Sequence, residues 1–269
     1  MSTNWHSDKD LAAKKRWYSS VAEAYDRIRP KYPEKIVHRA IELAQLPANA
    51  KILEIGCGPG IATIDFARSG FSLLCLEPNW DMCQIARRNC QPYPDVAISN
   101  TAFEEWQPDG TRFDAVLAAT SFHWVSAAVR YRKAAEVLSE NGALILLWNV
   151  VPHPPLETHP ILQPIYRKYA PSLMPEGSIE TDDENMKIFG KSAIGSGYFQ
   201  DLKVDRLLYE ITYSTEDYLM LLGTLSPYLE LEPSHRDSLF SELRETIEEN
   251  LGGEMRLLHL CICQVARKR

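Results

Sequence analysis

The apolar positions between residues 51 and 150 fall into short runs that are separated by amphipathic stretches. Short apolar runs bounded by Gly, Pro or Asn indicate buried strands, and apolar positions three and four residues apart indicate helices. We therefore predict strands at residues 51–55, 72–76, 95–98, 113–118 and 143–149, with helices near 61–68, 80–90 and 127–138. This alternation is typical of a mostly parallel sheet covered by helices on both faces.

The flanking segments add to this core. Helical patterns at 17–28 and 34–45 predict an N-terminal helical cap over residues 1–48, followed by the α/β core over 49–150. Seven prolines between 151 and 175 exclude a strand and allow only short helices, so we interpret 151–200 as a lid insertion. Residues 201–269 then complete the sheet, with a strand at 203–213, two helices up to Asn250, and an antiparallel strand at 255–266 after the Gly252-Gly253 turn.

Composition narrows the class of protein. The 269 residues are 45% hydrophobic, which is enough for a full core, and they fit a single domain. A net charge of −7 disfavours a general nucleic-acid binder. The six cysteines show no C-x-x-C and no zinc-ligand spacing, and no run approaches the roughly 18 apolar residues of a membrane span. We expect a soluble, cytoplasmic protein with reduced thiols and no metal.

The most specific motif is a glycine loop. Residues 52–60 read I-L-E-I-G-C-G-P-G, a buried strand that leads into three glycines and then a helix. Glycine permits a tight turn and close approach of a ligand to the backbone. The dinucleotide fingerprint requires Gly or Ala where this chain has Ile61, and the carboxylate of Glu54 would repel a pyrophosphate. The loop therefore favours a nucleoside that carries a positive group. An NAD-dependent oxidoreductase with a degenerate fingerprint is the alternative.

A second acidic residue supports a nucleoside. Glu77 ends the next strand, 21 positions after Gly56. A carboxylate at this place can accept hydrogen bonds from both ribose hydroxyls. Loop and acid together predict an adenosine-type ligand.

The pattern E-x-G-x-G-x-G after a strand, with an acid at the end of the second strand, resembles the class I S-adenosylmethionine-dependent methyltransferases. Residues 113–124, F-D-A-V-L-A-A-T-S-F-H-W, and residues 134–144 are similar to the fourth and fifth strand regions of small-molecule methyltransferases. The F-H-W segment and the tyrosines at 18, 25 and 32 are most similar to the trans-aconitate methyltransferase-like subgroup. This resemblance implies an α/β, Rossmann-like, seven-stranded, mostly parallel sheet with helices on both faces and an antiparallel last strand.

The resemblance also implies a set of residues that bind S-adenosylmethionine. The methionine part would lie on the glycine loop, with Glu54 near its ammonium group, and Arg29 would bind its carboxylate, although Arg27 has the same features. Glu77 would hold the ribose, Ala119 would accept from the amino group through its carbonyl oxygen, and aromatic and apolar groups would enclose the adenine. The full set is Tyr18, Tyr25, Arg29, Glu54, Gly56, Gly58, Gly60, Glu77, Met82, Ala102, Phe103 and Ala119.

The acceptor is expected beyond the fourth strand, where His123 and Trp124 lie, with Tyr32 and Trp148 beside them. His123 is the candidate catalytic residue, as a general base or, for a carboxylate acceptor, as a binding group. The Asn/Asp-Pro-Pro-Tyr segment of nucleobase methyltransferases is replaced by Ala-Thr-Ser-Phe at 119–122. We therefore predict methyl transfer to a small molecule, with a carboxylate oxygen favoured by the subgroup resemblance. A cofactor-binding protein without catalysis is the second alternative.

Overall fold

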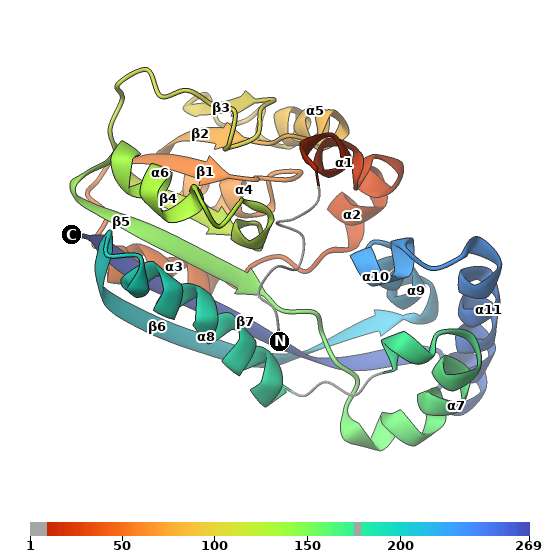
Figure 1. The fold of residues 1–269 in the computed structure, drawn as a ribbon. Helices are drawn as coiled ribbons and strands as arrows, with labels where there is room; N and C mark the ends of the chain where they lie inside the picture. Colours follow the sequence, from red (N-terminus) through yellow and green to blue (C-terminus); the bar gives the residue numbers. More distant parts are fainter. Residues whose placement is uncertain (1–9, 175–178) are drawn as a thin grey trace.

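The computed structural model describes residues 10–174 and 179–269. Seven strands form one sheet in the order β3-β2-β1-β4-β5-β7-β6 (Figure 1). The strand β7 is antiparallel to both of its neighbours, and the other strands pair in parallel. The strands are β1 (Lys51–Ile55), β2 (Ser72–Leu76), β3 (Val96–Ser99), β4 (Phe113–Ala119), β5 (Leu138–Asn149), β6 (Phe199–Ser214) and β7 (Glu254–Lys268). The predicted fold class is confirmed.

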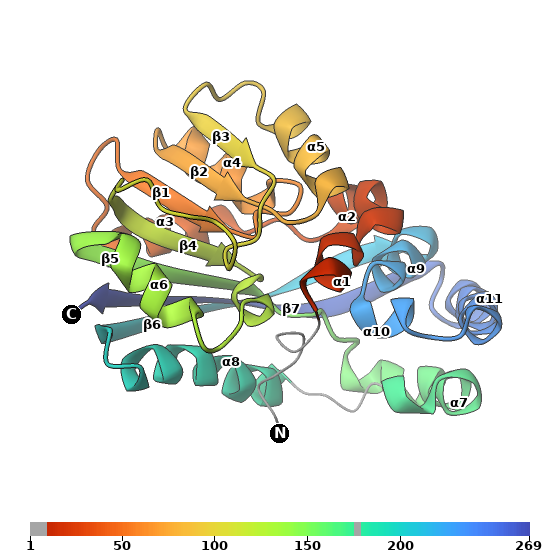
Figure 2. The same cartoon turned by 45° about the horizontal axis from the view of Figure 1, so that its top comes forward.

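Helices cover both faces of this sheet (Figure 2). On one face lie α3 (Glu34–Ala44), α4 (Ile61–Arg68) and α5 (Trp80–Asn89), and on the other lie α6 (Arg130–Val137) and α8 (Ile179–Gly195). Side chains alternate between the faces along each strand. Within β1, Ile52 therefore packs in the α3–α4 layer, whereas Leu53 packs in the α6–α8 layer. A sheet buried on both faces explains why its central strands read as continuous apolar runs.

A group of helices stands at the carboxyl edge of the sheet, beyond the far end of β6 (Figure 1). It consists of α7 (His159–Tyr169), α9 (Thr215–Gly223), α10 (Ser226–Leu229) and α11 (Pro233–Asn250), and we call it the helical group. Leu162, Tyr166, Leu239 and Leu243 are buried in its shared core. The helices α1 (Leu11–Arg16) and α2 (Ala22–Ile28) lie beside it. Ligands of open α/β sheets bind at this edge, so these helices are placed to cover a binding site.

The predicted helix at 17–28 is wrong as one continuous element. The chain instead has α1, a 3-10 turn at Ser19–Val21, and α2. Adjacent residues of a helix point about 100° apart. Here the Trp17 Nε1–H donates to Ser226 Oγ at 3.0 Å, and the Tyr18 hydroxyl also contacts that oxygen, at 2.9 Å. The break lets both aromatic side chains reach α10.

The prediction of only short helices between 151 and 175 is also wrong. The helix α7 has 11 residues although Pro164 lies inside it, and 3-10 turns at Leu156–Thr158 and Pro171–Leu173 flank it. Pro160 lies in the first turn, where a backbone N–H would have no helical partner. The cost of Pro164 is offset because Leu162, Ile165 and Tyr166 are buried in the helical group. Residues 215–250 form three helices where two were predicted.

Candidate functional site

A cavity of about 570 Å³ lies at the carboxyl edge of the sheet. Its walls come from the loop after β1, the ends of β2, β4 and β5, and helices α1, α2 and α8–α10. Its volume is in the range of small-molecule and cofactor sites. Of the predicted site residues, all but Gly60 line it: Tyr18, Tyr25, Arg29, Tyr32, Glu54, Gly56, Gly58, Glu77, Met82, Ala102, Phe103, Ala119, His123, Trp124 and Trp148.

The three glycines of the loop have different roles. All have positive φ, at +65° for Gly56, +56° for Gly58 and +93° for Gly60. A Cβ on Gly56 would lie 2.8 Å from the Cβ of Ser121, so this glycine allows the loop to approach the end of β4. A Cβ on Gly58 would meet nothing within 4 Å, so its backbone faces open cavity space that a ligand can enter.

Gly60 is the one predicted site residue that does not line the cavity. This residue is the N-cap of α4, and a Cβ there would lie 3.2 Å from Cys90 Sγ. It therefore serves the turn into α4 and the packing of α4 near α5, and it does not form part of the cavity wall. A glycine pattern alone cannot separate a ligand contact from a packing requirement.

Glu77 is held rigidly at the cavity wall. Its two carboxylate oxygens accept hydrogen bonds from the backbone N–H groups of Gly58 and Asn79, each at 2.8 Å. A carboxylate has further lone pairs, so both oxygens can still accept from a ligand. Burial raises the pKa of Glu77 to about 7, against the opposing effect of these two hydrogen bonds.

Glu54 is a second buried carboxylate on the same wall. Its Oε2 accepts from Thr63 Oγ1 at 2.6 Å and from Cys75 Sγ at 3.5 Å. Its Oε1 is buried and has no hydrogen-bond partner among the described residues. Burial raises the pKa of Glu54 to about 7, and the nearby Glu77 adds to that rise. A buried acidic oxygen without a partner is complementary to a hydrogen-bond donor, and a cationic donor would favour its ionised form.

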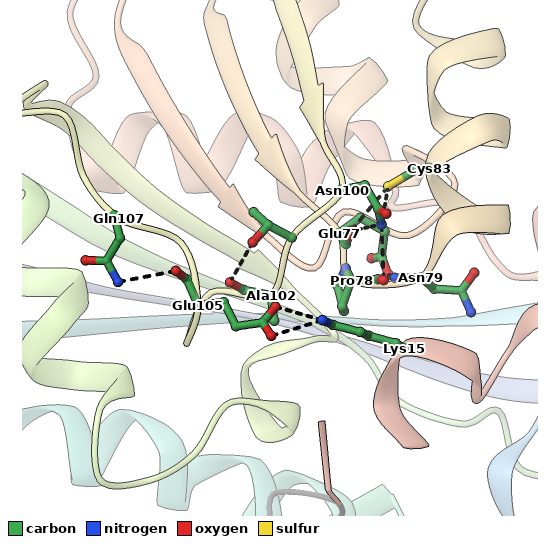
Figure 3. A network of polar contacts seen from close by, with 10 residues as sticks. Lys15, Glu77, Pro78, Asn79, Cys83, Asn100, Ala102, Glu105 and Gln107 are labelled. Atoms are coloured by element: carbon green, nitrogen blue, oxygen red, sulfur yellow. Dashed lines mark hydrogen bonds and ion pairs between the residues drawn. The ribbon is translucent and has the colours of Figure 1, made fainter. Parts of the chain in front are cut away.

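The loops after β2 and β3 are fixed to each other (Figure 3). The Asn100 side chain donates to the backbone oxygens of Glu77 at 2.9 Å and of Pro78 at 3.1 Å. Lys15 of α1 forms an ion pair with Glu105 of the second loop at 2.9 Å (Figure 3). These contacts fix the loop that carries the buried Ala102, and both Ala102 and Glu77 line the cavity.

The structure distinguishes the two candidate arginines. Arg29 lines the cavity, donates to Thr224 Oγ1 at 2.9 Å and to Thr224 O at 2.7 Å, and stacks over the Tyr25 ring at 4.4 Å. Within the described residues it has no carboxylate partner. Arg27 instead pairs with Asp217 at the surface and does not line the cavity. Arg29 is therefore the cation available to an anionic ligand group.

Aromatic side chains build the wall over the cavity. Tyr18 makes edge contacts with the rings of Tyr25, at 5.3 Å between centroids, and of Trp124, at 5.8 Å. Trp124 belongs to the 3-10 turn Phe122–Trp124 that follows β4, whereas both tyrosines come from the N-terminal segment. Segments about 100 residues apart in sequence thus meet over one site.

The end of the cavity near β4 and β5 carries the groups expected around an acceptor. The Tyr32 hydroxyl hydrogen bonds to Thr120 Oγ1 at 2.6 Å, and Thr120 has a positive φ of +51°. The rings of His123 and Trp148 lie 5.9 Å apart, and both residues are buried.

Residues 10–174 and 179–269 contain no group of three side chains that could hold a metal ion. None of the helices described in these ranges is long and apolar enough to cross a bilayer.

Sequence reasoning missed several cavity residues, above all His153 and Asp182, whose side chains form a hydrogen bond between Nε2 and Oδ2 at the cavity wall. His153 lies between prolines, and Asp182 lies in an acidic helix start, so neither position stands out in the sequence. Part of the predicted lid thus lines the cavity, although α7 packs in the helical group.

In sequence, this chain is similar to methyltransferases. Residues 52–142 match the family model described as "Methyltransferase domain". An uncharacterized methyltransferase of Mycobacterium tuberculosis is 33% identical over 132 residues, which cover 49% of this chain and 51% of the relative. A demethylmenaquinone methyltransferase of Tropheryma whipplei is 28% identical over 185 residues, which cover 65% of this chain and 74% of the relative. The matched part of the chain thus spans about half the length of the mycobacterial relatives.

A solved structure shows the same fold. It is described as a putative type II methyltransferase from Anaeromyxobacter dehalogenans, and it superimposes with a TM-score of 0.63 at 20% identity. The alignment covers 90% of this chain and 97% of that structure. The two proteins therefore share an overall fold.

Proposed function

We propose that this chain is a class I S-adenosylmethionine-dependent methyltransferase and transfers a methyl group from that cofactor to a small molecule. The match of residues 52–142 to a methyltransferase domain supports this proposal. The observation that carries the proposal is the wall beside Gly58. The backbone of Gly58 faces open cavity space, and the same cavity is lined by two buried carboxylates, Glu54 and Glu77. The Oε1 atom of Glu54 has no hydrogen-bond partner among the described residues. This wall is complementary to hydroxyl and ammonium donors and is unsuited to phosphates.

The residues of the cavity fit each part of the cofactor. Glu77 would accept from the ribose hydroxyls, Glu54 would favour the ammonium group, and Arg29 would bind the carboxylate in a charge-assisted pair. Met82, Ala102 and Phe103 would enclose the adenine, and the backbone around Gly56 and Ala119 would contact the methionine part. When bound, the cofactor supplies a methyl group on a sulfonium, which any correctly placed nucleophile can take.

The chain's own contribution to catalysis is positioning. A displacement at carbon gains most when the reacting atoms are held in line, and the aromatic wall of Tyr18, Tyr25 and Trp124 excludes water from that place. Tyr18 is itself kept neutral, since burial raises its pKa to about 12. A neutral ring face can lie against a cationic ligand, which adds cation–π attraction.

The proposed acceptor is a small molecule with an oxygen nucleophile. Trp148, Met186, Leu221 and Leu225 line the cavity, so an acceptor with apolar surface fits. The resemblance found in the sequence favours a carboxylate oxygen, and the kinship with a demethylmenaquinone methyltransferase supports a small-molecule acceptor in general. A carboxylate is ionised at neutral pH, so His123 would only bind and orient it.

An NAD-dependent oxidoreductase is not supported. Ile61 occupies the third position of the fingerprint, and the buried carboxylate of Glu54 stands where a pyrophosphate would have to lie. The match of residues 52–142 to a methyltransferase domain agrees with that reasoning.

The test is a screen of carboxylic acids, phenols, amines and thiols with methyl-labelled S-adenosylmethionine. We expect label in at least one acid or hydroxyl compound. For a carboxylate acceptor, His123→Gln should raise KM and leave kcat nearly unchanged between about pH 6 and 8. The acceptor is already ionised in this range, so neither the wild-type enzyme nor the variant needs a general base. Cofactor binding without transfer to any compound would instead indicate a binding protein.

A further inference from the structure

We propose that His153 and Asp182 form a general-base pair, and that the site methylates an ionisable hydroxyl group as well as a carboxylate. The inference rests on the proposed function and extends it to a second class of acceptor. It assigns a role to two cavity residues that the preceding mechanism does not use.

The position of His153 is fixed both through its backbone and through its imidazole ring. Its backbone exchanges two hydrogen bonds with Leu258 of β7, at 2.9 and 2.8 Å, which makes an isolated antiparallel bridge beyond the end of β5. Its Nε2 contacts the Asp182 carboxylate from the first turns of α8. Two elements that are distant in sequence thus hold one imidazole at the cavity wall.

The second ring nitrogen is available. Nδ1 of His153 has no hydrogen-bond partner among the described residues and is not a buried atom, and the side chain is 20% exposed. Asp182 is the charged group that contacts the ring, while the neighbouring Asp183 pairs with Lys187 and Arg206. A neutral imidazole whose Nε2–H donates to a carboxylate presents Nδ1 as a proton acceptor.

The pair lies on the acceptor side of the cavity. The glycine loop and Glu77 follow β1 and β2, whereas His153 bridges to β7, which is three strands from β1 in the sheet. Trp148 of β5 and Met186 of α8 line the same end. A hydroxyl acceptor lying there would meet a base on one side and the cofactor's sulfonium end on the other.

In the proposed step the acceptor O–H bond breaks, its proton moves to Nδ1 of His153, and the oxygen uses the electron pair it keeps to bond the methyl carbon. The bond between that carbon and the sulfonium sulfur breaks at the same time, its electron pair stays on sulfur, and the neutral thioether S-adenosylhomocysteine would leave. Asp182 stabilises the imidazolium and fixes its orientation, as carboxylates do for histidine bases elsewhere. The imidazolium then returns the proton to water. A carboxylate acceptor needs no such step, which is why the two acceptor classes separate in the test.

The test uses a nitrophenol, whose absorbance changes on ionisation, bound to the full chain together with S-adenosylhomocysteine. We expect the bound nitrophenol to ionise at lower pH in the wild-type protein than in His153→Asn, with Asp182→Asn in between. With labelled S-adenosylmethionine, His153→Asn should lower kcat for a phenol of high pKa by about 100-fold and leave kcat for a carboxylate acceptor unchanged.

The control is Asp183→Asn, which removes the adjacent ion pairs of α8 without touching the cavity lining. It should leave the ionisation of the bound nitrophenol as in the wild-type protein. If the bound nitrophenol ionises at the same pH in His153→Asn as in the wild-type protein, while the melting temperature and the cofactor affinity stay native, the His153–Asp182 pair has only a structural role. If no phenol binds beside S-adenosylhomocysteine, the proposed hydroxyl acceptor is excluded. Loss of S-adenosylhomocysteine binding by the wild-type protein would instead contradict the proposed function itself.

Discussion

Glu54 and Glu77 are two buried carboxylates on one wall, and burial raises the pKa of each from 4.5 to about 7. The folded protein therefore keeps these protons up to about pH 7, whereas an unfolded chain loses them near pH 4.5. Between about pH 4.5 and pH 7 the unfolded chain binds fewer protons than the folded protein, so the free energy of unfolding falls as the pH rises. A ligand that donates to both carboxylates favours their ionised forms and opposes this loss.

We predict that affinity for S-adenosylhomocysteine rises with pH. Between pH 6 and 8 a carboxylate with a pKa near 7 goes from mostly protonated to mostly ionised, which strengthens binding by about tenfold per group. Calorimetry across this range should also show proton release on binding at pH 7. Glu77→Gln should weaken binding by about 1–3 kcal/mol at pH 8 and reduce the pH dependence. An affinity that falls from pH 6 to 8 would show that neither carboxylate binds the ligand in its ionised form.

Gly58 offers a direct test of the loop. Gly58→Ala places a methyl group where the backbone faces open cavity space, and we expect it to lower cofactor affinity by at least tenfold. Gly110→Ala is the matched control, because Gly110 also has positive φ, at +95°, and an added Cβ also meets nothing within 4 Å. Both variants should lose about 1 kcal/mol of stability from backbone strain. Equal cofactor affinity in the two variants would move the ligand away from the loop.

Among the secondary-structure elements, α6 supports the cavity from outside. The Lys133 ammonium group donates to the carbonyl oxygens of Phe103, at 2.6 Å, of Glu104, at 3.2 Å, and of Trp106. Burial lowers the pKa of Lys133. One side chain thus holds the loop after β3, which supplies Ala102 and Phe103 to the cavity.

We predict that Lys133→Met destabilises the protein by about 1–2 kcal/mol, because three carbonyl groups lose a donor. It should also weaken cofactor binding, since the loop is no longer held. Thermal unfolding with and without S-adenosylhomocysteine measures both effects. The comparison is Lys187→Met, which removes ion pairs at the surface of α8 and should change stability by less than about 0.5 kcal/mol. Equal effects of the two substitutions would mean that the loop is held by packing alone.

The sequence predicts elements well where local pattern and burial agree. The run 51–55 became β1, and the last apolar run became the antiparallel β7. The sequence prediction fails where contacts between residues distant in sequence determine the local structure. The helix expected at 17–28 breaks because Trp17 and Tyr18 reach Ser226, and α7 persists through Pro164 because its apolar face is buried in the helical group. Neither contact leaves a local signal.

For the molecule as a whole, the residues proposed to bind the cofactor follow neighbouring strands, whereas the residues proposed to face the acceptor come from segments distant in sequence. Gly58 and Glu77 follow consecutive strands, so their meeting at one edge follows from the βαβ rule. His153 and Asp182 meet only because one segment bridges to β7 and α8 packs under the sheet. The spacing of residues therefore suffices to predict the class of cofactor, whereas the proposed acceptor pocket is visible only in the assembled fold.

We propose that the cavity at the carboxyl edge of the sheet binds S-adenosylmethionine. Calorimetry of the wild-type chain at pH 8 with S-adenosylhomocysteine, and in parallel with NADH, is the decisive measurement. We expect one site per chain for S-adenosylhomocysteine with a dissociation constant of about 1–100 μM, equivalent to roughly 5–8 kcal/mol, and no comparable binding of NADH. Absence of heat with S-adenosylhomocysteine and S-adenosylmethionine alike, or tighter binding of NADH than of both, would contradict it.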